Sequence, residues 1–380
     1  MRVLVVGGGP AGLYFAGLFK RSFPTHAVTL VEQNPCGATY GFGVVFAQAA
    51  LGYLAEADPA SYQRITAALE TWRDLTLVHR DRRLSIDGNG FSGISRLELL
   101  RILERFCSDA GVEIRHGETA TIDGIKGFDL VVGADGLNSV VQTAGASVFQ
   151  PQRETLGNRF VWYGTSRVFE TLTLTFRECA DGHFVAHHYR YAPDMSTFIV
   201  ECDAATFQSA GFARMTDDES RAYCERIFAP DLDDHVLISN KSEWRRFPVT
   251  RVEEWIDGNK VLIGDALRSV HFSIGSGTRL ALEDSIALWR AFLEYPEDVP
   301  AALDGFVAAR RPIVDKLLAA AAGSYGWYED IAQRMQLAPL DLAYDYMTRS
   351  GRVNEERLRR IAPRFMRVYD RDRGAGSRMD

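Results

Sequence analysis

Carboxylates and glycines that follow buried strands are the residues of this chain with the clearest chemical use. Val261–Gly264 has the apolar character of a buried strand, and Asp265 follows it directly. Gly275 and Gly277 then precede Thr278–Phe292, in which apolar residues recur at helical spacing. A carboxylate accepts hydrogen bonds from sugar-like hydroxyls, and a helix N-terminus offers free N–H groups and partial positive charge. The segment therefore suits a ligand with a polyol and a ring that becomes anionic on reduction.

The N-terminus carries a glycine pattern between a strand and a helix. Val3–Val6 is a continuous apolar run, as in a parallel strand covered on both faces. The pattern G-x-G-x-x-G follows, and a second strand (28–31) ends in an acid 20 positions after the last glycine. This context favours close approach of the backbone to a pyrophosphate and an acid for a ribose hydroxyl over a plain strand-to-helix turn. The residues predicted to bind the ADP part of a dinucleotide are Gly7, Gly9, Pro10, Ala11, Gly12 and Glu32.

Three further residues are predicted to bind the cofactor only when they are considered together with these segments. Asp135 and Gly136 follow the buried strand Phe128–Gly133, although an Asp-Gly pair at a strand end is most often a simple turn. Arg96 lies in the first turn of a predicted helix, where a cation opposes the helix dipole. That placement is explained if Arg96 faces a phosphate or a ring, but an exposed arginine there would also be ordinary.

Beyond position 150 the pattern changes to β-branched and aromatic runs at 160–163, 171–176, 183–191 and 197–201, which predict an antiparallel sheet. One face, with Trp162 and His187, would be rich in aromatic rings and suit a flat aromatic ligand, or would simply pack the sheet. The glycine-rich segment 37–46, which contains Phe42, is expected to be a loop close to that ligand, with an ordinary surface loop as the alternative. The chain then returns to the first domain. We therefore predict an α/β fold with a discontinuous Rossmann-like domain (1–77, 91–150 and 255–300), a substrate-binding sheet domain (78–90 and 151–254) and a helical C-terminal region (301–380).

Composition excludes several classes of protein. The chain has 380 residues and a net charge of −7, which argues against a nucleic-acid binder. Its five cysteines form no C-x-x-C pair, no apolar run has the length of a membrane span, and we expect a cytoplasmic protein. His183, His187 and His188 lack an Asp, Glu or Cys that would complete a set, so no metal is predicted. Neither a G-x-S-x-G elbow nor a Walker A sequence occurs.

Taken together, the three segments resemble the triple signature of the single-component FAD-dependent aromatic hydroxylases, the group A flavoprotein monooxygenases. The matching motifs are the glycine pattern with Glu32, Gly133–Gly136, and Gly264–Asp265 with Gly275 and Gly277. Closer in, the sequence is similar to salicyloyl-CoA and anthraniloyl-CoA hydroxylases in GFGVVF (41–46), STFIVEC (196–202), HFSIGSGT (271–278) and MTRSGRV (347–353). The length and WYGT (162–165) also resemble the tryptophan-derivative hydroxylase of the violacein pathway.

The resemblance implies a fold like that of para-hydroxybenzoate hydroxylase, with non-covalent FAD and with NADPH or NADH docking transiently as the reductant. Reduced flavin would react with O2 to give a C4a-hydroperoxide, which hydroxylates an electron-rich aromatic substrate such as an aryl-CoA thioester or a biosynthetic aromatic intermediate. His271 is the predicted catalytic residue, through hydrogen bonding or proton transfer, although it could instead only contact the flavin. Phe42, Trp162, His187 and Phe272 are the predicted substrate contacts. The protein is expected to be a monomer or homodimer.

The sequence departs from the family pattern at several positions, and it leaves other functions open. Arg268 stands where a histidine is usual, Arg279 replaces an asparagine and Gln142 replaces an arginine, which leaves the choice of reductant open. A hydroxylase or epoxidase of a free indole or quinolone is the nearest alternative. A flavin-dependent halogenase is more remote, because no W-x-W-x-I-P stretch is present. A non-catalytic, redox-sensing flavoprotein is the third alternative.

Overall fold

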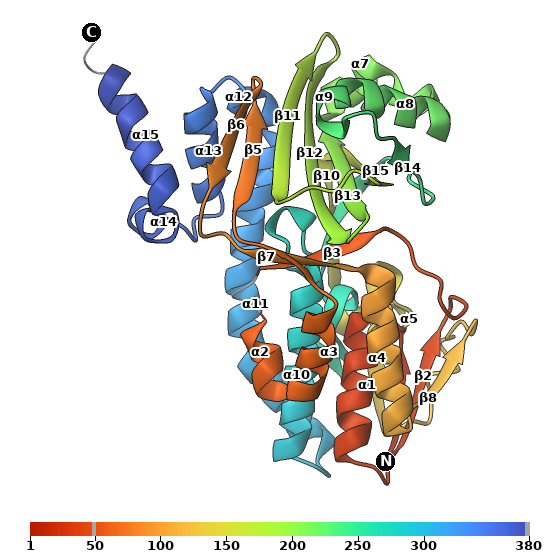
Figure 1. The fold of residues 1–380 in the computed structure, drawn as a ribbon. Helices are drawn as coiled ribbons and strands as arrows, with labels where there is room; N and C mark the ends of the chain where they lie inside the picture. Colours follow the sequence, from red (N-terminus) through yellow and green to blue (C-terminus); the bar gives the residue numbers. More distant parts are fainter. Residues whose placement is uncertain (48–50, 377–380) are drawn as a thin grey trace.

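The computed structural model describes residues 1–47 and 51–376 and arranges them in two stacked halves (Figure 1). The half that contains the N-terminus is built on a sheet of order β16-β17-β9-β1-β2-β8, in which all neighbours are parallel except the pair β16 and β17. Its strands are β1 (Arg2–Val6), β2 (Ala27–Glu32), β8 (Glu113–His116), β9 (Leu130–Gly133), β16 (Ile256–Asp257) and β17 (Lys260–Leu262).

Continuous apolar strands explain this sheet, because a parallel strand covered by helices is buried on both faces. Val3–Val6 of β1 and Leu130–Val132 of β9 are buried. The main covering helices are α1 (Pro10–Ser22), α4 (Arg96–Ala110) and α10 (Gly277–Glu294), the last of which agrees with the predicted helix at 278–292. Since β1, β2, β9 and β17 are parallel, their carboxyl ends lie at one edge, where segments distant in sequence meet.

The other half holds a sheet of order β14-β10-β13-β12-β11-β5-β6, with β15 paired to β10. All its pairs are antiparallel except that of β5 and β11, so the predicted α/β fold with an antiparallel-sheet domain is confirmed. The strands are β5 (Leu75–His79), β6 (Arg82–Ile86), β10 (Pro151–Thr165), β11 (Leu172–Cys179), β12 (Gly182–Ala192), β13 (Met195–Cys202), β14 (Leu237–Ile238) and β15 (Arg245–Val252).

Alternation along β10, β12 and β13 divides this sheet into two different faces. Tyr163, Phe184 and Phe198 lie in an apolar cluster with residues from α8 (Asp217–Ile227) and α9 (Ala229–Leu232). The adjacent positions, such as Trp162 and His187, point the other way, toward the nucleotide-binding half. The sheet is therefore the floor of a space that the two halves enclose.

A small sheet of β3 (Gly43–Ala47), β7 (Phe91–Ser95) and β4 (Glu70–Trp72) lies between the halves (Figure 1). The expectation that 37–46 is a loop is wrong from Gly43 onward, because Val44 and Phe46 are buried in antiparallel pairing with β7. The shorter helices are α2 (Gly52–Ala57), α3 (Pro59–Ala67), α5 (Val140–Ala144), α6 (Ala146–Phe149) and α7 (Ala204–Ala210), with 3-10 turns at η2 (Gly136–Asn138), η3 (Phe212–Arg214), η4 (Gly264–Ala266) and η5 (Phe272–Ile274).

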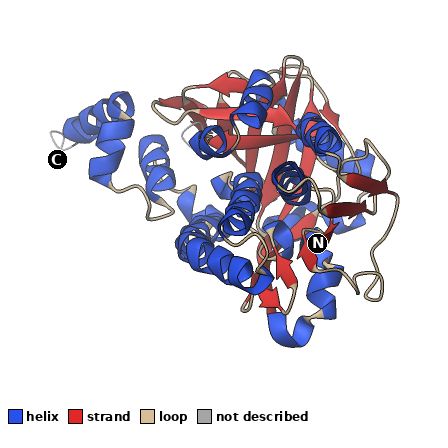
Figure 2. Cartoon of the chain, turned by 90° about the horizontal axis from the view of Figure 1, so that it is seen from below, coloured by secondary structure: helices blue, strands red, loops and turns tan. Residues whose placement is uncertain are grey.

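The C-terminal region is helical, with α11 (Val299–Glu329), α12 (Ile331–Arg334), α13 (Pro339–Thr348), α14 (Glu355–Ile361) and α15 (Pro363–Gly376). Seen from below, the strands occupy the middle of the molecule and the C-terminal helices lie to one side (Figure 2). Side chains of α13–α15 join an apolar cluster with β5, β6 and β11. Within the described residues, no helix combines the length and apolar character needed to cross a membrane.

Candidate active site

A cavity of about 390 Å³ opens at the edge where the parallel strands end. The structure brings almost all the predicted cofactor-binding residues to its wall: Gly7, Gly9, Pro10, Ala11, Glu32, Arg96, Asp135, Gly136, Asp265, Gly277 and Thr278. Gly12 lies behind the wall and Gly275 lines a second cavity. Four strand ends thus supply one site, which is the arrangement expected of a dinucleotide-binding α/β sheet.

The glycines of the first turn have separate physical roles. Gly7 has φ of 107°, and a Cβ there would lie 2.4 Å from the carbonyl oxygen of Ala134. A Cβ at Gly12 would lie 2.0 Å from the carbonyl oxygen of Gly7, so this glycine permits close packing of helix and strand. A Cβ at Gly9 would meet no atom within 4 Å, because this position faces the cavity. The turn therefore packs tightly against the protein at Gly7 and Gly12 and leaves space for a ligand at Gly9.

Two helices direct uncapped N-termini at this cavity. Neither α1 nor α10 has a side-chain cap or an acidic residue in its first turn, and Pro10 occupies the first turn of α1. Their first backbone N–H groups consequently lack partners within the helix, and both ends carry partial positive charge. These ends fit the pyrophosphate and the electron-rich edge of a flavin.

The acidic residues at the strand ends are held in different ways. Glu32 accepts N–H groups from Gly8 at 2.6 Å and from Asn34 at 2.8 Å. Asp135 accepts the N–H of Val140 at 2.7 Å, while its Oδ1 has no partner and burial raises the pKa of its carboxyl. An orphaned buried oxygen of this kind indicates a missing hydrogen-bond donor.

Asp265 and Arg96 both line the cofactor cavity and interact electrostatically. Burial raises the pKa of the Asp265 carboxyl, whereas Arg268 and Arg96 lower it. Burial lowers the pKa of the Arg96 guanidinium, whereas Asp265 and Glu32 raise it. Although the surrounding protein partly desolvates it, the side chain of Asp265 is exposed to the cavity, so its oxygens can accept hydrogen bonds from a ribityl chain.

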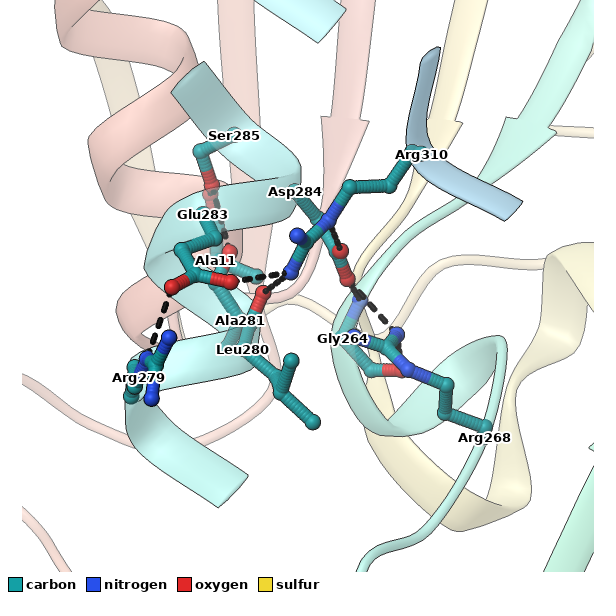
Figure 3. Close-up of polar contacts among 10 residues, drawn as sticks. All are labelled: Ala11, Gly264, Arg268, Arg279, Leu280, Ala281, Glu283, Asp284, Ser285 and Arg310. Atoms are coloured by element: carbon teal, nitrogen blue, oxygen red, sulfur yellow. Dashed lines mark hydrogen bonds and ion pairs between the residues drawn. The ribbon is translucent and has the colours of Figure 1, made fainter. Parts of the chain in front are cut away.

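A buried ion cluster anchors the Gly-Asp turn beneath this cavity (Figure 3). Asp284 of α10 is 0% exposed and lies between Arg268, at 2.6 Å from Oδ2, and Arg310, at 2.8 Å from Oδ1. Its Oδ2 also accepts the N–H of Gly264 at 3.1 Å. Arg310 pairs in addition with Glu283, which binds Arg279 at 2.7 Å. The residues that depart from the family pattern at 268 and 279 are therefore both engaged in this cluster.

The third departure, Gln142, connects the Asp-Gly and Gly-Asp segments. Its Nε2 donates to the carbonyl of Ala266 at 2.8 Å, and its Oε1 accepts from Arg153 at 2.7 Å. The two turns are thus tied directly to each other.

A second cavity, of about 270 Å³, lies between the first one and the floor of the antiparallel sheet. It shares Arg96, Leu137, Asp265, Gly277 and Thr278 with the cofactor cavity, so the two are neighbours along one wall. Besides these shared residues, the aromatic and charged side chains around it are Phe91, Trp162, His187, Tyr189, Phe247, Phe272, Tyr346 and Arg349. Such a space suits a flat aromatic ring next to the cofactor.

Trp162, His187 and Phe272, three of the four predicted substrate contacts, line this cavity. Phe42 does not: its ring lies against Gly164, where an added Cβ would be 2.4 Å from Phe42 Cε1. Its backbone carbonyl instead accepts the N–H of Arg96 at 2.9 Å. Phe42 thereby positions the start of α4.

His271 is also outside the lining of either cavity. It is 3% exposed and stacks on Phe272, and its Nδ1 accepts the N–H of Ser273 at 3.2 Å. The resemblance implied that this histidine lies between flavin and substrate, but the sequence does not show which way the turn directs its ring. The geometry gives His271 a capping role one layer behind the substrate cavity.

Sequence reasoning missed Glu201, Tyr346 and Arg349. Glu201 is buried and lies 3.2 Å from Nε2 of His187. Arg349 lies with its guanidinium carbon 3.7 Å from the centre of the Tyr346 ring and donates to the carbonyl of Ser273 at 2.7 Å. The segment MTRSGRV, which contains Arg349, was a signal, since it matched the resembling hydroxylases although it lies outside the three cofactor motifs.

The buried state of His271 predicts a pH dependence of stability. Burial lowers the pKa of its imidazole from 6.5 to about 4. Below pH 6.5 the unfolded chain takes up a proton that the folded protein excludes until about pH 4, so stability falls over this range and not above it. The loss attributable to this group is about 3 kcal/mol.

His271→Asn isolates this contribution, because asparagine can also accept the N–H of Ser273 but does not titrate. Burial also lowers the pKa values of His79 and His188, which both proteins retain. In denaturant titrations between pH 7 and pH 4, we expect the variant to lose less stability than the wild type. Parallel losses in the two proteins would show that folding does not lower the pKa of His271.

The sequence profile of the family described as FAD binding domain matches residues 110–321. Salicyloyl-CoA 5-hydroxylase of a Streptomyces species is 36% identical over 361 residues, which cover 92% of this chain and 70% of that protein. The chain belongs to the FAD-dependent aromatic monooxygenases. Two further relatives of this monooxygenase are 3-hydroxy-4-methyl-anthranilyl-[aryl-carrier protein] 5-monooxygenase of Streptosporangium sibiricum (36% identical, covering 93% of this chain and 95% of that one) and protodeoxyviolaceinate monooxygenase of Chromobacterium violaceum (35%, 92% and 94%).

Solved structures support the fold of this monooxygenase. The tetrameric form of 2-methyl-3-hydroxypyridine-5-carboxylic acid oxygenase superposes with a TM-score of 0.73 at 18% identity, covering 95% of both chains. The family profile and the three relatives confirm the predicted family, enzyme class and FAD cofactor, and the family uses NAD(P)H and O2.

Proposed function

We propose that this monooxygenase hydroxylates an electron-rich aromatic ring that is attached to coenzyme A or a carrier protein through a thioester. The observation that carries the proposal is the second cavity, whose aromatic wall adjoins the cofactor cavity along Asp265, Gly277 and Thr278. Support also comes from two relatives, whose names specify a CoA-linked and a carrier-linked aromatic substrate.

Bound FAD, once reduced by NAD(P)H, supplies an electrophilic oxygen atom from O2. The residues of this chain hold and enclose the reacting groups. Glu32 and Asp265 accept hydrogen bonds from the ribose and ribityl hydroxyls, and the N-terminus of α10 stabilises negative charge on the flavin ring. Trp162 and Phe272 hold the aromatic ring of the substrate and exclude water from it.

A hydroxylase of a free bicyclic aromatic compound is the second candidate, because protodeoxyviolaceinate monooxygenase covers nearly the whole chain at similar identity. The reaction would be the same, and only the thioester-linked group of the substrate would be absent. A cavity of about 270 Å³ favours a single ring, with the rest of a larger substrate outside it.

A substrate screen distinguishes these functions. Purified holoenzyme is mixed with NADH or NADPH and one of 2-hydroxybenzoyl-CoA, 2-hydroxybenzoate, indole or a quinolone, and product is identified by mass spectrometry. We expect 2-hydroxybenzoyl-CoA to stimulate reductant oxidation and to gain one oxygen atom. Oxygen transfer only to free compounds would contradict the thioester proposal. Halide incorporation would indicate a halogenase, and reductant oxidation unaffected by any aromatic compound would indicate a redox module.

The remaining expectations stay predictions: a cytoplasmic monomer or homodimer with the domain limits given above. Light scattering of the holoenzyme would test the oligomeric state, for which the structural relative cited above is named as a tetramer.

A further inference from the structure

His187 lies on the floor of the second cavity, in the middle of the antiparallel sheet. Its strand partners are Leu174 on β11 and Ile199 on β13, so its immediate surroundings on the floor are apolar. The rings of Phe272 and Tyr328 lie at 5.2 and 5.1 Å from its centroid. A histidine in this position is fixed by packing and still borders the space proposed for the aromatic ring.

Glu201, on the neighbouring strand β13, holds one nitrogen of this imidazole. Its Oε2 is 3.2 Å from His187 Nε2, and its Oε1 accepts from Asn158 Nδ2 at 2.9 Å. Asn158 is held in turn, because the same amide nitrogen donates to the carbonyl of Tyr328 at 2.8 Å. Burial alone would raise the pKa of the Glu201 carboxyl, but the hydrogen bonds from His187 and Asn158 bring it below its usual value. Glu201 is therefore an ionised acceptor, 1% exposed.

This contact assigns the tautomer of His187. A carboxylate can only accept, so Nε2 carries a proton and the neutral ring has its lone pair on Nδ1. Among the described residues, the hydrogen bond of Nε2 with Glu201 is the one that this ring makes, so Nδ1 has no partner there. Two other titratable groups of the cavity lining are engaged: Tyr189 donates to the carbonyl of Gly43, and Arg349 donates to Ser273, Ser324 and Tyr346.

We propose that His187 is a catalytic base that accepts the proton of a hydroxyl group on the substrate's aromatic ring, and that Glu201 is the residue that positions it. The substrate O–H bond breaks and an N–H bond forms at Nδ1 of His187. The aromatic ring of the substrate then has the electron density of a phenolate, and the Glu201 carboxylate stabilises the positive charge of the imidazolium. An electrophilic oxygen then attacks a carbon made more reactive. This inference rests on the proposed function and narrows its substrate class to phenolic thioesters.

The charged and titratable groups near His187 come from several elements. They are Glu201 of β13, His271 before η5, Tyr328 of α11, Arg349 after α13 and, on the opposite face of the same strand, His188. His271 is neutral above pH about 4, because burial lowers its pKa. Only Glu201 among these groups is placed to receive the proton on Nε2.

The test compares His187→Asn, Glu201→Gln and the wild type as holoenzymes with 2-hydroxybenzoyl-CoA. In oxidised enzyme without reductant, the wild type should shift the bound phenol to the phenolate absorption, and His187→Asn should not. We expect kcat to fall about 10²- to 10⁴-fold in His187→Asn, and about 10- to 100-fold in Glu201→Gln, which loses a hydrogen bond to a charged group. The rate of His187→Asn should rise with pH until the pH exceeds the pKa of a free phenol, which is about 10. KM should change much less than kcat.

His188→Asn is the matched control, because it replaces the neighbouring buried histidine of β12 on the opposite face, where it contacts Thr175. We expect it to lower the melting temperature without changing the pH profile or the phenolate absorption. If His187→Asn hydroxylates with the wild-type pH profile and keeps the phenolate absorption, the inference is overturned and the proposed function stands. If the wild type transfers no oxygen to the thioester, the proposed function fails and the inference with it.

Discussion

Asp284→Ala is expected to lower the free energy of unfolding by about 3–5 kcal/mol, because it strands buried positive charges. Arg268 and Arg310 are 3% and 4% exposed, and Asp284 bonds to both. Two guanidinium nitrogens of Arg268, Nε and Nη2, already lack partners, and Asp284 is the one acid within the described residues that forms an ion pair with this arginine. The Gly264 N–H also loses its acceptor. The midpoint of guanidinium unfolding of FAD-saturated protein measures the loss.

Two comparisons make this result specific. Asp123→Ala removes a carboxylate of an exposed ion pair with Lys126 and should leave the midpoint unchanged. Adding Arg268→Met to Asp284→Ala should recover part of the loss, since it removes one stranded cation. A midpoint for Asp284→Ala equal to that of the wild type would mean that water reaches the cluster and that it contributes little.

Asp265→Ala is expected to yield colourless protein that binds added FAD at least about 10-fold more weakly. The Asp265 carboxylate borders both cavities and is open to ligand hydroxyls, and a hydrogen bond to a charged group contributes about 1.5–3 kcal/mol. Arg96 and Arg268 would keep their positive charge and lose a nearby negative one. Visible flavin absorbance after purification and a titration of flavin fluorescence give the result.

Asp265→Asn is the matched control, because its amide oxygen can still accept one hydrogen bond. It should bind FAD with an affinity between those of the wild type and Asp265→Ala. Both variants should unfold near the wild-type midpoint when no FAD is bound, because Asp265 makes no hydrogen bond to the described protein. If Asp265→Ala is as yellow as the wild type, the carboxylate does not hold the flavin.

The cofactor site could be predicted because its determinants are local. A glycine turn after a buried strand is encoded within a few residues, and parallel strands necessarily bring their carboxyl ends to one edge. Gly7, Glu32, Asp135 and Asp265 therefore meet although they are distant in sequence. The alternation of β12 likewise predicted that His187 faces an aromatic-lined space.

The rest depends on contacts that no local pattern encodes. Glu201 shares its face of β13 with Ile199, but nothing adjacent in the sequence identifies His187 as its partner. Asp284 likewise occupies an apolar face of α10, and its partner Arg310 comes from another helix. Whether His271 or Phe272 borders the cavity is decided by the turn at η5, which the glycine motif does not specify.

The flavin content of the purified protein tests the central claim most directly, because every assignment depends on the three turns binding one FAD. Denaturation of a known amount of protein, followed by chromatography and mass spectrometry of the released cofactor, gives identity and stoichiometry together. We expect one FAD per chain, released without covalent attachment. A colourless protein that also fails to take up added FAD would contradict the account.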